Sequence, residues 1–131
     1  MTYKHFKSAD AKENDFGSIV VQNLLDDPEY LNLSVAKVKI VGEQKLLKSG
    51  QNIQADLLKV GHHGSDTATG ADFLAKVSPA NAVIQVGQDN KFGLPDLRVI
   101  NLLTRLGVAI LRNDLQGDII FTFKEGQVIL N

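Results

Sequence analysis

Short apolar segments alternate with helix-patterned segments through the middle of the chain, and this alternation limits the available folds more than any other feature. The segments typical of buried strands are residues 55–60 and 81–87, and those with helix signals are residues 71–77 and 95–107. Strands that alternate with helices in this way are typical of α/β domains. The middle of the chain is therefore predicted to form a sheet covered by helices.

The segment 95–107 has the clearest helix pattern in the chain. Pro95 is expected in its first turn and Gly107 at its end. Apolar residues recur at helical spacing and predict a buried stripe made of Leu97, Ile100, Leu103 and Leu106.

The flanks of this central unit are predicted to be mainly strands. Residues 17–25 and 31–41 are expected as strands before a short helix at 42–50, and residues 108–131 as a strand, a turn at 114–117 and a terminal hairpin. Residues 1–16 are polar and are expected to be irregular or only partly ordered. Together these elements predict a single domain over residues 1–131, of the α/β class, with a mixed sheet.

The composition excludes several functional classes. The chain has 14 basic and 15 acidic residues, so its net charge supplies no general field for holding nucleic acid. It has no cysteine, which excludes disulfides and thiolate metal sites. It contains no apolar run of about 18 residues, so no membrane-spanning segment is expected. Four lysines could line a basic rim, for which a solvated face is the default interpretation: Lys45, Lys48, Lys59 and Lys91.

Two of the three histidines stand side by side, in the sequence LLKVGHHGSD at residues 57–66. The loop after a buried strand is where open α/β sheets carry their chemistry, and imidazole is the commonest metal ligand. His62 and His63 are therefore candidate metal ligands, and Ser65 and Asp66 are candidate binding residues that either cap the next segment or orient a histidine. The alternative is that the doublet is only a turn, because a metal site needs three or four converging ligands.

The sequences ADLLKVGHHGSDTATG, VGQDNKFG and RNDLQGDIIF resemble the C-terminal half of the metallo-β-lactamase-fold domain of the ComEC competence protein family and of related hydrolases. The resemblance covers residues 14–123 and is sharpest at 55–65. It implies half of a four-layer αββα sandwich, with a mixed sheet and helices on one face. The family's site binds one or two divalent metals, zinc or manganese, for hydrolysis. By this resemblance His62 is the expected metal ligand, and His63 is its expected outer neighbour or substrate contact.

Three departures from the family pattern bear on that site. The family's main metal motif, His-x-His-x-Asp-His, is not in this sequence. Its bridging aspartate has Glu43 as the only counterpart, and an ordinary place in the first turn of a helix is the more expected role for Glu43. The Gly-His-Pro of many relatives is replaced by Gly93-Leu94-Pro95. The remaining donors are too few to cage a metal ion, so this chain alone is not expected to bind zinc or manganese stably.

Two functions remain open at this point. In the first, the chain is a truncated or degenerate metallo-β-lactamase-fold domain of the ComEC type, related to DNA uptake and not catalytic by itself. In the second, it is part of a metal-dependent phosphodiesterase or nuclease that a missing N-terminal half or a second chain completes. Half of a sandwich leaves one sheet face uncovered, so a homodimer is expected. The resemblance further implies DNA as a partner and a bacterial protein, extracytoplasmic if it is part of a competence membrane protein.

Overall fold

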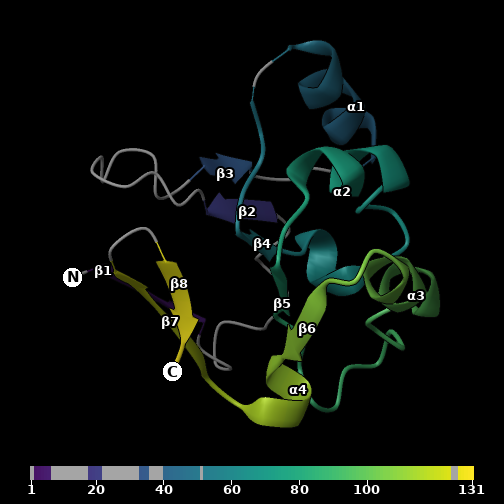
Figure 1. Ribbon diagram of the computed structural model, residues 1–131. Coiled ribbons are helices and arrows are strands. Elements are labelled where there is room, and N and C mark those ends of the chain that lie inside the picture. Colours follow the sequence, from purple (N-terminus) through teal and green to yellow (C-terminus); the bar gives the residue numbers. More distant parts are fainter. Residues whose placement is uncertain (1, 7–17, 22–32, 36–39, 51, 125–126) are drawn as a thin grey trace.

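A computed structural model describes residues 2–6, 18–21, 33–35, 40–50, 52–124 and 127–131 (Figure 1). The strands are β1 (Thr2–Phe6), β2 (Ser18–Val21), β3 (Leu33–Val35), β4 (Leu57–Lys59), β5 (Asn81–Ile84), β6 (Ala109–Arg112), β7 (Ile119–Lys124) and β8 (Gln127–Leu130). The helices are α1 (Ile40–Lys48), α2 (Ala71–Val77), α3 (Leu97–Arg105) and α4 (Asn113–Gln116), with a short 3-10 turn η3 (Gly61–Gly64).

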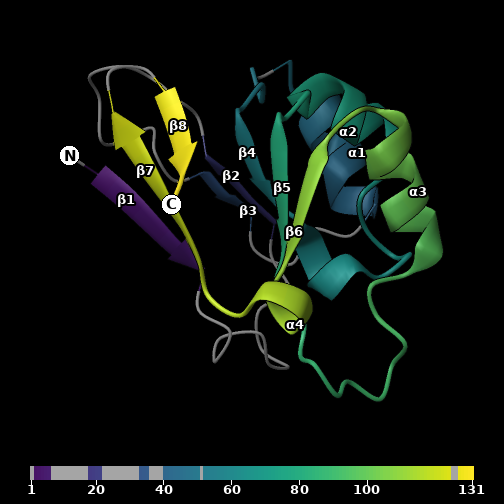
Figure 2. The ribbon, with the colours of Figure 1, turned by 60° about the horizontal axis from the view of Figure 1, so that its bottom comes forward.

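The strands form two sheets. The larger sheet has the order β3-β2-β4-β5-β6, in which β4, β5 and β6 are parallel and β2 and β3 are antiparallel. The smaller sheet is antiparallel, in the order β1-β7-β8. Figure 2 shows the helices α1, α2 and α3 on one side of the larger sheet and the smaller sheet on its other side. The predicted mixed α/β class, with these helices on one face of the sheet, is confirmed.

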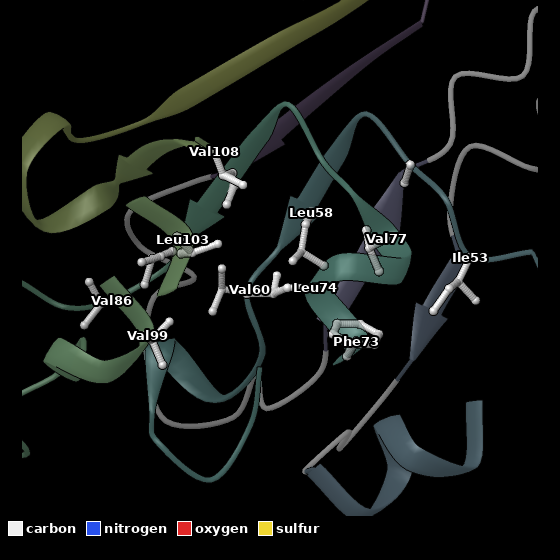
Figure 3. Close-up of a cluster of buried hydrophobic side chains, with 13 residues drawn as sticks. Ile53, Leu58, Val60, Phe73, Leu74, Val77, Val86, Val99, Leu103 and Val108 are labelled. Atoms are coloured by element: carbon white, nitrogen blue, oxygen red, sulfur yellow. The ribbon is translucent and has the colours of Figure 1, made fainter. Parts of the chain in front are cut away.

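Both faces of the parallel strands are buried, because neighbouring residues along a strand point to opposite sides. On the helix side, strand residues pack against α2 and α3 in the main core cluster (Figure 3), which includes Leu58, Val60, Phe73, Leu74, Val77, Ile84, Val99 and Leu103. On the opposite side, a second cluster joins the two sheets, with Leu57, Val83 and Leu111 packed against Ile119 and Phe121 of β7. The sequence predicted that this face of the sheet is uncovered, and a dimer was expected to cover it. At β4–β6 the chain's own β7 covers the face, so the face gives no reason there to expect a dimer.

Residues 2–6 correct the expectation of an irregular N-terminus. They form β1, which pairs with β7 so that Thr2 lies opposite Phe123 and Phe6 lies opposite Ile119. A strand at the edge of a sheet is held through its backbone groups, which leave no apolar signature in the sequence. The partner strand is also more than a hundred residues away in the chain, so local sequence does not reveal the pairing.

Other expected elements are confirmed with shifted boundaries. The helix predicted at 71–77 is α2, at the same bounds, and the terminal hairpin is β7 and β8. Ile40 and Val41 begin α1 rather than end a strand, and the turn expected at 114–117 is largely the helix α4. The expectations for residues 7–17, 22–32 and 36–39 lie outside the described residues.

The default interpretation of the four lysines as a solvated face is wrong at Lys59, and so is the alternative of a basic rim. This side chain lies on β4 and is only 1% exposed, so it belongs to the interior rather than to a solvated face. The strand is buried on both sides, and alternation along it places Lys59 on the same side as Leu57.

Helix α3 is present, and it buries only part of the predicted stripe. Asp96 is its N-cap and accepts a hydrogen bond from the backbone N–H of Arg98, so Pro95 precedes the helix. Val99 and Leu103 are the buried residues, whereas Leu97 is 74% exposed and Leu106 is 46% exposed. Of the predicted stripe, Leu103 is buried and Ile100 packs against the core. The two end residues are exposed, because packing against the sheet decides which side of the helix is covered.

The phase of α3 predicts a difference between two leucine substitutions. Leu103→Ala removes a fully buried side chain and is expected to lower the free energy of unfolding by about 2–5 kcal/mol. Leu97→Ala, on the exposed side of the same helix, is expected to change it by less than about 0.5 kcal/mol. Urea denaturation of both variants measures this difference. Equal losses of unfolding free energy would mean that Leu97 is buried, as the sequence pattern suggested.

Candidate functional site

The candidate residues gather at one edge of the larger sheet. Parallel strands bring their carboxyl ends to the same edge, so the segments that follow β4, β5 and β6 meet there. The turn η3, with His62 and His63, follows β4 and leads through Ser65 and Asp66 to the start of α2. The segment 85–96 follows β5, and α4 follows β6.

His63 is the buried member of the doublet, with a 9% exposed side chain. Its Nδ1 lies 2.6 Å from the backbone oxygen of Gln85, just beyond the end of β5. A carbonyl only accepts hydrogen bonds, so in the neutral ring Nδ1 carries the proton and Nε2 carries the lone pair. A histidine held through Nδ1–H by a backbone carbonyl has the support that is typical of metal-ligating histidines.

His62 is more exposed, and its support comes from its own loop. Its Nδ1 lies 2.7 Å from the hydroxyl of Thr67, which in turn lies 3.1 Å from the hydroxyl of Ser65. The Ser65 hydroxyl therefore contacts the partner of His62, while the Ser65 N–H donates to the backbone oxygen of His62 at 2.9 Å. The carboxylate of Asp66 is 3.5 Å from the Ser65 hydroxyl, at the limit of a hydrogen bond. Neither of these two residues caps α2, whose N-cap is Gly70.

The backbone of this loop is left-handed at four positions. His62 and His63 have φ values of 51° and 54°, Gly64 follows with 82°, and Thr69 has 62°. Glycine adopts this region freely, whereas for histidine, and still more for a β-branched residue, it is costly. At Gly64 a side chain is also excluded, because a Cβ atom would lie 2.6 Å from the Cβ of Pro95. A loop that served only as a turn would be more stable with glycine at the histidine positions.

Glu43 holds the end of the loop from the side of α1. The residue is fully buried, and its carboxylate oxygens accept hydrogen bonds from the backbone N–H groups of Thr69 and Gly70, at 2.6 and 2.8 Å. Burial raises the pKa of this carboxyl, although both N–H groups and the charge of Arg98 act in the opposite direction. The weak metal candidate of the sequence analysis is therefore a residue that binds backbone.

Arg98, which the sequence analysis did not single out, holds the same segment from the side of α3. Its guanidinium donates to the backbone oxygens of Asp66, Ala68 and Thr69, at 3.0, 2.6 and 3.1 Å. The planar fork of arginine suits several acceptors at once. We call Glu43 and Arg98 together the backbone clamp. The contacts join residues about thirty positions apart in the chain, and an arginine on a predicted helix gives no local sign of them.

Asn90 organises the neighbouring segment that follows β5. Its amide donates to the backbone oxygens of Gly87 and Leu94 and accepts from the N–H groups of Phe92 and Leu94. An asparagine between glycines is a signal for such a turn. Leu94, at the position of the family's Gly-His-Pro histidine, packs against the main core cluster and so has an apolar role.

The described residues do not complete a metal site. No group of three or more histidine, aspartate or glutamate side chains gathers within the part of the chain that the structure describes. At the same edge, Asp114 is bound in a bidentate ion pair to Arg112, at 2.9 and 2.5 Å, and this contact raises the pKa of the guanidinium. His5 is in β1, opposite Ile120.

The fold and this edge define the chain as a small mixed α/β unit with a histidine doublet at the carboxyl edge of its parallel strands. It is 41% identical over 83 residues to ComE operon protein 3 of Bacillus subtilis and 39% identical over 88 residues to competence protein ComA of Neisseria gonorrhoeae. It is also 31% identical over 100 residues to recombination protein 2 of Haemophilus influenzae. The chain is therefore a distant homologue of proteins of the ComEC competence family.

The similarity is confined to a small part of each relative. The matched segments are 63%, 66% and 76% of this chain, but only 11–13% of the lengths of the three relatives. No family model matches the chain. Among the helices in the described ranges, none has the length and apolar character that crossing a membrane requires.

Because the backbone at His62 is left-handed, glycine is expected to stabilise the protein more than alanine at this position, which is the reverse of their order in a helix. Both His62→Gly and His62→Ala lose the hydrogen bond to Thr67, so their difference reports the backbone alone. His62→Gly is expected to be the more stable by about 1–2 kcal/mol. Ala75 is an exposed residue of α2 and serves as the control. There Ala75→Gly is expected to lower the free energy of unfolding by about 1 kcal/mol, because glycine is the poorer residue in a helix. Equal stability of the two His62 variants would mean that this residue is not left-handed.

The backbone clamp predicts a large cost for removing the Glu43 carboxylate. Glu43→Ala leaves the N–H groups of Thr69 and Gly70 without their acceptor, at about 1–3 kcal/mol for each buried group. Asp89→Ala, which removes an exposed carboxylate, is the control and is expected to change the free energy of unfolding by less than about 0.5 kcal/mol. A Glu43→Ala protein as stable as the control would show that the carboxylate does not hold the loop.

Proposed function

We propose that this chain is the C-terminal half of a metallo-β-lactamase-type domain from a DNA-uptake competence system, and that it does not catalyse hydrolysis by itself. The similarity to competence proteins supports the competence system. The sequence resemblance of residues 14–123 to the C-terminal half of a metallo-β-lactamase-fold domain supports the domain type. The order of layers is compatible with this proposal, since helices cover one face of the larger sheet and a second sheet covers the other.

The observation that carries the proposal is the small number of side chains that could bind a metal ion. His63 has a fixed ring with the lone pair on Nε2, and His62 is its immediate neighbour, so zinc or manganese would find two imidazoles at most in the described residues. We assign the ligand role to His63 rather than to His62, which reverses the preference from the sequence pattern. Glu43 does not fit as a ligand, because both of its oxygens are engaged by backbone N–H groups. Two donors are below the three that a stable zinc site needs.

The proposal predicts weak metal binding and no hydrolysis by the isolated chain. After incubation with Zn²⁺ or Mn²⁺ and gel filtration, elemental analysis is expected to find well under one ion per chain, and single- and double-stranded DNA should remain intact. His5→Ala is the control for loss of a histidine elsewhere. One ion retained per chain, lost in His63→Ala but not in His5→Ala, together with DNA cleavage, would contradict the proposal.

A second candidate is favoured by the cost of the left-handed histidines. A strained backbone that carries two imidazoles is typical of a working site. In this alternative the doublet supplies part of a zinc- or manganese-dependent phosphodiesterase, and a missing N-terminal half or a second copy of the chain supplies the remaining ligands. Completion by a second copy requires DNA cleavage whose rate rises with the square of protein concentration, and a dimer in a molecular-mass measurement. A monomer with no cleavage at any concentration excludes the second copy.

A further inference from the structure

The two histidines are held by different parts of the molecule. His63 is bonded to the backbone of Gln85, at the end of a core strand, and the neighbouring Gly64 oxygen accepts from the N–H of Asp96. His62 is bonded to Thr67, which lies within the segment 66–70 that the backbone clamp holds. One imidazole is therefore fixed by the sheet, and the other by a loop.

We propose that Arg98 and Glu43 are positioning residues for the imidazole of His62 and not for that of His63. The purpose of this positioning would be to place a second metal donor beside the first, and this purpose rests on the proposed function. The positioning itself depends only on the contacts within this chain. Neither residue of the backbone clamp is a catalytic residue, because both act on His62 through the backbone around Thr67.

The argument follows the path of hydrogen bonds. Arg98 fixes the carbonyls of Asp66 and Ala68, which flank Thr67 on both sides. Thr67 has an exposed side chain, and its hydroxyl is held near His62 by the Ser65 hydroxyl, 3.1 Å away, and by the fixed backbone on either side of it. The left-handed backbone of Thr69 is costly, so this residue is expected to relax once the backbone clamp is lost, and the loop to move with it. The bond between His63 and Gln85 includes no atom of this path.

The test compares the two rings in one protein by imidazole ¹⁵N NMR. In Arg98→Ala the Nδ1 signal of His62 is expected to shift, while the Nδ1–H signal of His63 stays in place. Arg98→Lys keeps the charge without the planar fork and is expected to shift His62 by a smaller amount. Arg105→Ala, an exposed arginine on the same helix, is the matched control and should move neither ring.

A second variant guards against a loss of folding in Arg98→Ala. Thr67→Val removes the hydroxyl at an exposed position and leaves the backbone clamp intact, so it should reproduce the shift of His62 alone. The proposal is overturned if Thr67→Val leaves His62 unchanged, or if Arg98→Ala moves both rings together or neither. A joint movement would mean that Arg98 only supports the fold.

A titration with Zn²⁺, followed at the same ring signals, separates this inference from the proposed function. Loss of a residue that orients a ligand typically weakens metal binding by about 10–100-fold, and this is the effect expected for Arg98→Ala. Unchanged affinity would contradict the positioning of a donor pair. If the unmodified chain shows no response to Zn²⁺, the assignment of His63 as a metal ligand fails. The ring shifts still decide the positioning of His62.

Discussion

The backbone clamp is the interaction on which the site depends. Glu43 accepts from two backbone N–H groups and Arg98 donates to three backbone oxygens, all within residues 66–70. The buried Glu43 carboxylate thereby gains the hydrogen bonds that make its burial tolerable, and these backbone groups of the loop are paired without regular secondary structure. Because α1 and α3 supply one residue each, the loop is fixed to both helices that flank α2, and the costly left-handed residues persist.

The same arrangement explains how the loop at this edge keeps its shape through contacts within the chain. The loop is supported by the backbone clamp, by the carbonyl of Gln85 and by the close approach of Gly64 to Pro95, and none of these contacts requires a metal ion. Leu94, in the segment after β5, packs against the main core cluster. The geometry of this edge thus depends on contacts within the described part of the chain.

Much of the fold could be predicted from sequence because its signals are local. The helix at 71–77 and the apolar strands around it follow from periodicity, and the histidine doublet lies in a loop directly after a buried strand, as predicted. What sequence reasoning missed depends on contacts between distant residues. The phase of α3 is set by packing against the sheet, β1 by its pairing with β7, and the role of Arg98 by carbonyls some thirty residues earlier in the chain. Glu43 was noticed for its position in a motif, but its function as an acceptor for Thr69 and Gly70 is visible only in three dimensions.

Native-state hydrogen exchange of the Thr69 and Gly70 amides tests the central claim most directly. These amides lie in a loop, where exchange is ordinarily fast, and only the carboxylate of Glu43 gives them an acceptor in the structure. The account predicts protection close to that of the core amide of Val60, which is bonded to Val83. Exchange of Thr69 and Gly70 at the rate of exposed loop amides would show that the backbone clamp is not formed in solution.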